Sequence, residues 1–242
     1  MKRIILALIL SLVISATYAQ KRKKGNQPDF KSEMISHYKT FYKEMIKNKD
    51  YLSAIQGLNH LIILEPQNVA RKDTLGLLYY TVDNPSIAIN VLKDSETELG
   101  LRTKALAYKK VKDLKQAIDS YEQLLEKFYN VKDAYELAQL QYGVQNFGNA
   151  KLTINKALAE AKDEKVQIIV ARNSYIETPI KAAFLNILGL IEYNNNVANT
   201  DKAVKIFDQA LAVDPEFILA LENKKGILEK RNTPTVDAKK KQ

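Results

Sequence analysis

The chain has 242 residues, of which 46% are hydrophobic, so it is long enough to bury a core or to form one continuous repeat array. It contains no cysteine, which excludes disulfides, thiol chemistry, a cysteine-ligated metal site and a lipoprotein anchor. Its 6 prolines and 8 glycines are few, and because both residues interrupt long helices, the composition favours an all-α chain.

The formal net charge of +9 belongs to the ends of the chain. Basic residues in the segments 2–3, 21–24 and 239–241 account for all of it, so the stretch between the two longer basic runs is neutral. This distribution argues against a nucleic-acid-binding fold, in which basic residues gather on one folded face. A basic tail can contact phosphates or an anionic surface, although a solvated tail is the simpler interpretation.

The first element is a signal peptide, expected at residues 1–19. Lys2 and Arg3 precede an apolar run over 4–16, and Ala19 ends the segment with a small residue, so the mature chain is expected to begin at Gln20. The apolar run is shorter than the ~20 residues of a membrane span. The basic run at 21–24 resists translocation, so an uncleaved anchor and a cytoplasmic protein remain as alternatives.

Residues 20–30 are expected to form a disordered basic lead, and helices are expected from Phe30 onward. Apolar residues recur there at spacings of three and four, which is the period of amphipathic helices. No segment alternates with period two for long enough to predict a sheet. The one β-branched run, residues 166–170, is ambiguous between helix and strand.

A repeated pair of residues divides the helical region into units. An alanine near the start of each second helix is followed four positions later by a large apolar or aromatic residue. The pairs are Ala54 and Leu58, Ala88 and Leu92, Ala117 and Tyr121, Ala150 and Ile154, and Ala203 and Phe207. The alanines are 34, 29, 33 and 53 residues apart, against a period of 34 in a common helical repeat.

First-helix motifs accompany these alanines. Leu75-Gly76 with Tyr79 and Leu188-Gly189 stand upstream of two of them, and two units end in a proline, at 64–66 and 213–215. With these motifs the chain resembles the tetratricopeptide-repeat (TPR) family over residues 31–230. Glu192 in place of the usual aromatic, and Gln139 in place of a small residue, depart from the family pattern.

The resemblance implies an all-α, right-handed superhelical solenoid of about five helix-turn-helix units. The expected units are 35–68, 69–97, 98–131, 132–164 and 182–215, followed by a capping helix at 216–230 and a disordered basic tail at 231–242. Small residues such as Gly76, Ala105 and Gly189 should let paired helices approach closely.

The capping helix is expected to have one apolar, buried face and one polar, solvent-exposed face. Phe217, Leu221 and Leu228 are assigned to its buried face, with Glu222, Lys225 and Glu229 on the exposed one.

An insertion at 165–181 separates the fourth and fifth units. We expect the preceding helix to continue to about Arg172 and to break at Asn173 and Ser174, with Thr178 capping the next helix and Pro179 in its first turn. The extension either packs against a gap in the solenoid or forms a partner-binding arm.

No catalytic constellation is apparent in the sequence. The two histidines, His37 and His60, form no helical pair at metal spacing, and Glu33 four residues before His37 predicts only a weak surface pair. A glycine-rich phosphate loop and a nucleophile elbow are both missing. We therefore predict a non-enzyme with no catalytic residue, metal site or cofactor.

The TPR resemblance implies that a peptide or protein binds in a concave groove lined by the first helices. The residues expected on that face are Lys39, Lys43, Leu77, Tyr80, Arg102, Leu106, Lys109, Leu140, Leu190 and Tyr193. They predict an apolar groove with basic flanks, suited to an amphipathic helix or to an extended peptide with some acidic residues. Alternatively, the leucines pack against the neighbouring unit.

Two functions fit these features. The first is a non-catalytic interaction scaffold, exported to the periplasm or the cell envelope, whose partner is another protein and whose mature chain has no transmembrane span. The second is an envelope-surface adaptor whose basic termini hold it to an anionic polymer or lipid.

Overall fold

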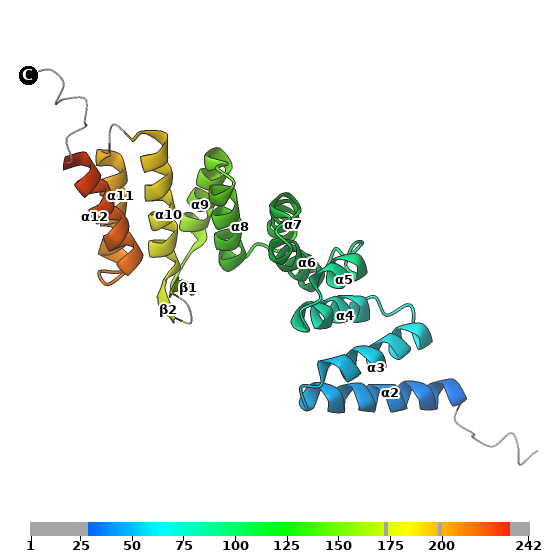
Figure 1. Ribbon diagram of the computed structural model, residues 1–242. Helices are drawn as coiled ribbons and strands as arrows, with labels where there is room; N and C mark the ends of the chain where they lie inside the picture. The colour runs from blue at the N-terminus through cyan, green and yellow to red at the C-terminus, as the bar shows by residue number, and fades with distance from the viewer. Residues whose placement is uncertain (1–28, 172–173, 198–199, 233–242) are drawn as a thin grey trace, which may run out of the picture. The chain divides into compact units, whose positions relative to one another are not determined.

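The computed structural model describes residues 29–171, 174–197 and 200–232. These residues form helices joined by short turns, together with one two-stranded hairpin (Figure 1). Two compact units divide the chain, Met1–Leu75 and Gly76–Gln242. The expected signal peptide, residues 20–28 of the basic lead and residues 233–242 of the tail lie outside the described residues.

The first unit is built on two paired helices, α2 (Phe30–Lys47) and α3 (Tyr51–Leu64). Asp50 caps α3 by accepting a hydrogen bond from the Ser53 backbone N–H at 3.1 Å, which satisfies one of the donors that a helix start leaves free. A side-chain carbon at Gly57 would lie 2.9 Å from the Phe41 ring, so the close approach of α2 and α3 depends on this glycine.

The second unit repeats the same arrangement several times. Helix α4 (Ala70–Thr81) begins in the first unit and ends in the second. The helices that follow are α5 (Pro85–Val91), α6 (Glu98–Lys110), α7 (Leu114–Lys127), α8 (Val131–Gly143), α9 (Phe147–Glu160), α10 (Ile180–Asn195), α11 (Asp201–Val213) and α12 (Ile218–Asn232). Contacts are densest within the pairs α6 with α7, α8 with α9 and α10 with α11, which are helix-turn-helix units.

The repeated alanines occupy equivalent buried positions. All five have no exposed surface, because the facing helix lies directly against them. The large residue four positions later is at most 2% exposed in every case: Leu58, Leu92, Tyr121, Ile154 and Phe207. The sequence pattern therefore marks the contact between the two helices of each unit.

The turn between paired helices also repeats. In the first four helix-turn-helix repeats this turn contains one non-glycine residue with φ between 59° and 64°. That residue stands immediately before the Asp or Asn that precedes the second helix. These left-handed residues are Lys49, Asp83, Lys112 and Gln145. Such a conformation costs roughly 1–2 kcal/mol for a residue with a side chain, and the surrounding helix pair holds it in place.

We predict that Gly189→Ala destabilises the second unit. An added Cβ would lie 2.8 Å from the ring of Phe207, which has no exposed surface, so the substitution should lower the free energy of unfolding by about 1–3 kcal/mol. Gly226→Ala is the matched control, because no atom lies within 4 Å of a Cβ there and alanine should gain roughly 0.5–1 kcal/mol of helix propensity. Denaturant titration of both variants measures the difference, and equal stability of the two would contradict this packing.

The segment expected to prolong α9 is a β-hairpin instead. Helix α9 ends at Glu160, and strands β1 (Lys165–Ala171) and β2 (Ser174–Pro179) pair antiparallel, with Ile168 opposite Ile176. The prediction of a helix to Arg172 is therefore wrong. Burial alternates along β1, with Val166 and Ile168 covered, so a period-two pattern was present but short.

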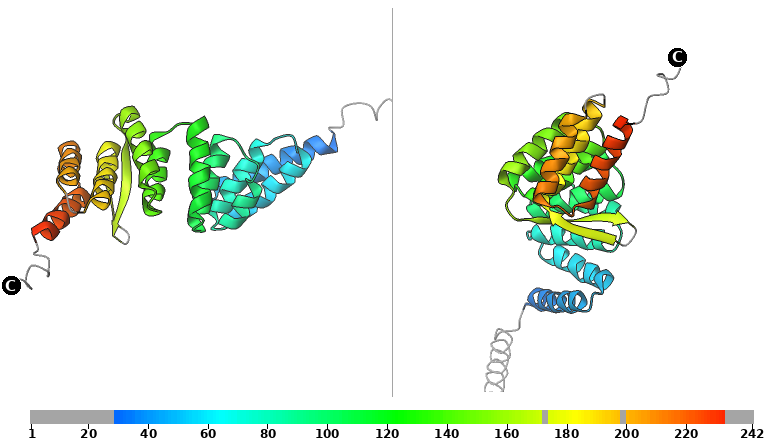
Figure 2. Two further views of the ribbon diagram at one scale, coloured as in Figure 1. Left: turned by 90° about the horizontal axis from the view of Figure 1, so that it is seen from above. Right: turned by 90° about the vertical axis from the view of Figure 1, so that its left-hand side faces the viewer.

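Thr178 and Pro179 also differ from expectation. Thr178 donates a hydrogen bond from its hydroxyl to the Asp214 carboxylate instead of capping α10, and this bond ties β2 to the end of α11. Pro179 occupies the residue before α10, not its first turn. The hairpin lies against α10, as both views of Figure 2 show.

Helix α12 (Ile218–Asn232) overlaps the range 216–230 expected for a capping helix, but the residues that it buries differ from the expected ones. Phe217 just before it, with Ala220 and Ile227 on it, is buried, whereas Leu221 is 42% exposed. These buried positions follow spacings of three and seven, which share one helix face. The assignment of Leu221 to the buried face is wrong.

Glu192, which departs from the TPR pattern, forms ion pairs within its own helix-turn-helix repeat and with the preceding one. Its carboxylate is 9% exposed and pairs with Lys202 of α11 at 2.8 Å and with Lys151 of α9. Burial alone would raise the pKa of Glu192, but hydrogen bonds from these two lysines outweigh it and hold the pKa below its usual range.

We predict that Glu192→Gln lowers the free energy of unfolding by about 1–2 kcal/mol at neutral pH. A carboxyl whose folded pKa is depressed contributes stability above its unfolded pKa of about 4.3 and loses it as the pH falls through the folded pKa. The difference between the wild type and the variant should therefore narrow as the pH falls from neutral through this range. Unfolding measured across that pH series is the test, and a pH-independent difference would contradict the assigned role.

Candidate partner-binding groove

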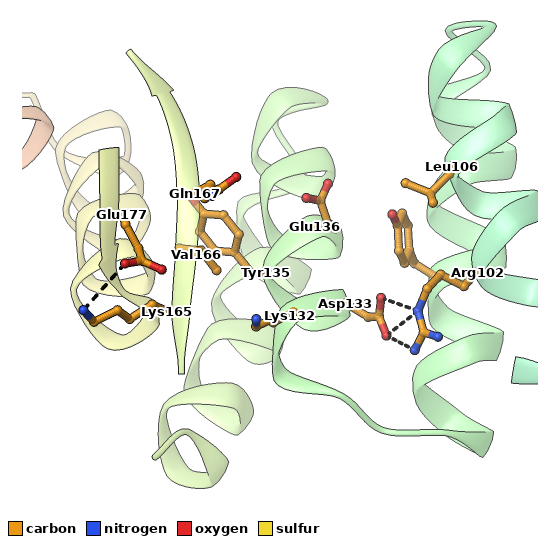
Figure 3. Close-up of a pocket in the computed structure, with 11 residues that line it drawn as sticks. Arg102, Leu106, Lys132, Asp133, Tyr135, Glu136, Lys165, Val166, Gln167 and Glu177 are labelled. Atoms are coloured by element: carbon orange, nitrogen blue, oxygen red, sulfur yellow. Dashed lines mark hydrogen bonds and ion pairs between the residues drawn. The ribbon is translucent and has the colours of Figure 1, made fainter. Parts of the chain in front are cut away.

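A pocket of about 430 Å³ lies in the second unit, beside the first helices α6 and α8 and the hairpin (Figure 3). Tyr121 of α7 also lines it. The residues that line it are Arg102, Leu106, Tyr121, Lys132, Asp133, Tyr135, Glu136, Lys165, Val166, Gln167 and Glu177. First helices therefore do form a hollowed surface, and the hairpin adds a wall to it.

Apolar side chains form the floor of the pocket. Leu106, Tyr121, Tyr135 and Val166 contribute, and the Tyr121 side chain is only 1% exposed. Burial, reinforced by the nearby carboxylates of Glu136 and Asp133, raises the pKa of Tyr121 far above its usual range. Burial likewise raises the pKa of Tyr135 to about 12, so both phenols stay neutral near pH 7.

Ion pairs between successive first helices form the rim. The Arg102 guanidinium of α6 donates to both carboxylate oxygens of Asp133 of α8, at 2.7 and 3.0 Å, and to Glu98 at 2.8 Å. Lys109 pairs with Glu136, two turns after Arg102 on α6 and about one turn after Asp133 on α8. Figure 3 shows the Arg102–Asp133 pair at the edge of the pocket. These contacts fix the spacing of α6 and α8, because a two-pronged pair constrains geometry.

Two of the predicted groove residues line this pocket, and a third contacts its rim. Leu106 belongs to its apolar floor and Arg102 to its charged rim, and Lys109 reaches the rim through Glu136. Both cations are engaged by carboxylates, so the groove carries less free positive charge than the sequence indicates. Leu140 is 7% exposed and packs with Leu101, Tyr121 and their neighbours in a hydrophobic cluster, as the alternative interpretation of the leucines expects.

Other predicted groove residues lie elsewhere on the first helices. Leu77 and Tyr80 are half-buried on α4, and the Lys110 ammonium lies 5.1 Å from the centre of the Tyr80 ring. Leu190 and Tyr193 are half-buried on α10, where Lys230 of α12 lies 5.9 Å from the Tyr193 ring.

The two lysines predicted for the groove in the first unit, Lys39 and Lys43, are exposed on α2. Lys39 pairs with Glu65 at 3.5 Å, and Lys43 lies one turn further along the same helix. Lys39 and Lys43 therefore lie outside the hydrophobic core of the first unit.

The sequence analysis did not predict the acidic residues of the rim or the hairpin residues that line the pocket. Asp133 and Glu136 stand 31 and 27 residues after their cationic partners, close to one repeat period, so a search for opposite charges one repeat apart would have found them. Lys165, Val166 and Gln167 were missed because their segment was assigned to a helix. Lys132 is exposed, and its position in the first turn of α8 is the only sequence feature that could have indicated it as a lining residue.

The two histidines pack on either side of one tyrosine in the first unit. The His60 ring stacks on Tyr38 at 4.3 Å between ring centres, and the His37 ring meets Tyr38 edge-on at 5.2 Å. Within the described ranges no group of three or more histidines and carboxylates is arranged to hold a metal ion. No helix in that part of the chain is both long and apolar enough to cross a membrane.

No protein family model matches the chain, and no curated protein matches its sequence. Solved structures do match its fold. A crystal structure of MamA shares 19% identity and a TM-score of 0.57, covering 85% of this chain and 99% of MamA. A tetratricopeptide-repeat protein from Parabacteroides merdae shares 17% identity and a TM-score of 0.61, covering 83% of this chain and 75% of its own.

A third structure is that of YrrB, described as a TPR protein with an unusual peptide-binding site. It shares 13% identity and a TM-score of 0.62, and the match covers 81% of this chain and 98% of YrrB. Identities this low carry information about fold alone. Together with the repeated alanines and the paired helices, they establish that this chain has the tetratricopeptide-repeat fold.

Proposed function

We propose that this chain is a non-catalytic interaction scaffold of the cell envelope, which binds a segment of another protein on the face made by its first helices. The observation that carries the proposal is the pocket beside α6 and α8, with its apolar floor and charged rim. Binding sites for peptides commonly combine an apolar surface with a few placed polar groups. YrrB, which shares the fold, is described as having a peptide-binding site.

The envelope assignment rests on the signal-like segment at 1–19. N-terminal analysis of natively expressed protein should find a mature chain that begins at Gln20. A cytosolic species that retains Met1 would contradict export.

Site-specific photocrosslinking in the native envelope tests the scaffold role. A photoreactive residue in place of Leu106, on the pocket floor, should crosslink to a discrete partner protein. The matched control is the same residue in place of Leu152, which is 69% exposed on the second helix α9. Crosslinks from position 152 but none from position 106 would contradict binding at the first helices.

The second candidate function, an adaptor held to an anionic surface, is favoured by one observation: the net charge resides in the chain ends. Attachment through those ends should weaken steeply as salt is raised, because exposed charges are screened. Envelope binding that persists in high salt would exclude it.

A further inference from the structure

The hairpin presents the free edge of β1 to the pocket. The sheet of the described residues has two strands, so each strand is paired on one side only. Three successive residues of β1, Lys165, Val166 and Gln167, all line the pocket. Lys165 and Gln167 share one face of the hairpin, and Glu177 of β2, which stands opposite Gln167, also lines the pocket, so the pocket borders this face and reaches past β1 to α8. Figure 3 shows β1 between β2 and α8.

The register of the hairpin directs backbone groups toward that edge. The Ile180 N–H donates to the Glu164 carbonyl at 2.8 Å, and bonded pairs alternate along an antiparallel ladder. Since Glu164 and Ile180 form a bonded pair, the next pair, Lys165 with Pro179, is non-bonded, and so is Gln167 with Glu177. The backbone N–H and C=O groups of Lys165 and Gln167 therefore point away from β2. Pro179 stands opposite Lys165, at a position where a ladder needs no N–H donor. Outside the ladder, no backbone hydrogen bond joins Lys165 or Gln167 to another described residue.

Charge varies along α8 beside this edge. Lys132 lies in the first turn of α8, on the α8 side of β1, and Glu136 lies one turn further along, whereas the Lys165 side chain runs the other way, toward Glu177 of β2 (Figure 3). The Lys165–Glu177 pair is 3.7 Å long and both side chains are more than half exposed, so it holds Lys165 only weakly. Lys132 is the cation on the α8 side of this edge, and its charge already helps to lower the pKa of the nearby Glu164 carboxyl, so an anionic group of a partner would meet Lys132 there.

We propose that the partner segment binds as an extended strand, adding to the free edge of β1 and placing an acidic residue beside Lys132. This inference rests on the proposed scaffold function and specifies the chemistry of its partner. A helical segment would satisfy its own backbone and leave the edge of β1 unpaired, whereas an extended peptide bonds to it directly. The apolar floor at Leu106 and Tyr135 would take alternate side chains of the strand.

Selection from a random library of short displayed peptides, with the purified full chain as bait, tests the proposal. Selected peptides should alternate apolar residues and carry an acidic residue at one end. N-methylation of alternate backbone amides in a selected peptide keeps its side chains but removes donors, and should weaken binding by about tenfold or more.

Matched proline variants localise the site on the chain. Gln167→Pro removes an outward N–H of β1 without breaking the hairpin ladder and should weaken binding by a similar factor. Tyr175→Pro makes the equivalent change on β2, outside the pocket, and should leave binding intact. Lys132→Glu should weaken binding of the acidic peptide, and thermal unfolding of each variant confirms that it is folded.

Several results would overturn the proposal. If the selected peptides are helical, or if they bind equally well after N-methylation, strand addition is wrong. Concentration-dependent dimers that Gln167→Pro abolishes, without any selected peptide, would instead assign the edge to a second copy of this chain. If position 106 crosslinks to a partner, and Gln167→Pro does not reduce that crosslinking, the scaffold function stands but strand addition at β1 is wrong.

Discussion

Leu140→Ala is expected to lower the free energy of unfolding by about 2–5 kcal/mol, although the sequence places this leucine on the groove face. The side chain is 7% exposed and packs with Leu101, Tyr121 and Leu137 in the cluster that α6, α7 and α8 share. Truncation removes buried methyl groups and leaves a cavity between the third and fourth repeats. Denaturant unfolding of the full chain measures the loss.

Leu106→Ala is the matched comparison, because this leucine lies on the pocket floor and is only partly buried. It should cost about 1 kcal/mol or less in stability but should weaken partner binding by roughly 1–2 kcal/mol. Leu152→Ala, at a 69% exposed position, should change neither quantity. A Leu106→Ala variant as unstable as Leu140→Ala would place Leu106 in the core and remove it from the groove.

The second large effect is expected at Phe207. Its ring has no exposed surface and lies against Gly189, where α10 and α11 meet. Phe207→Ala should therefore lower the free energy of unfolding by about 3–5 kcal/mol, by the loss of buried apolar area and the cavity that remains.

Tyr175→Ala serves as the control for Phe207→Ala, since this aromatic is 64% exposed near the hairpin tip and should cost less than about 1 kcal/mol. Chemical denaturation followed by far-ultraviolet circular dichroism reports both variants. Similar losses in the two would contradict the assignment of Phe207 to the shared core of this helix pair.

The repeated helix pairs could be predicted from the sequence because each unit needs the same contact. An alanine where two helices touch and a large residue four positions later recur with the repeat, and the structure buries all of them. Gly76 and Gly189 were identified for the same reason, as a Cβ at either would overlap a side chain of the facing helix. Such local rules operate within one unit and leave a periodic record.

The hairpin could not be predicted by the same means. Its strands are short, and Val166, Ile169 and Val170 also fit the three- and four-residue spacing of a helix. Its pairing depends on residues that stand opposite only after folding. Thr178 reads as a helix cap in sequence, yet its partner Asp214 is 36 residues away. Contacts between units, such as Arg102 with Asp133, are likewise set by stacking and not by neighbouring sequence.

Arg102 and Leu106 could be placed near a hollow from the sequence, because a TPR unit turns its first helix to one side. The composition of the groove was predicted less well, since whether a leucine faces the groove or the next unit depends on a small rotation of the helix. Leu106 and Leu140 occupy equivalent sequence positions, but one lines the pocket and the other is buried.

Amide hydrogen exchange of the full chain, with and without the partner identified by crosslinking, tests the central claim most directly. The partner should slow exchange in α6, α8 and β1, whose residues line the pocket, and should leave α9 and α11 unchanged. Protection confined to the second helices α9 and α11, with α6 and α8 unaffected, would contradict binding at the first helices.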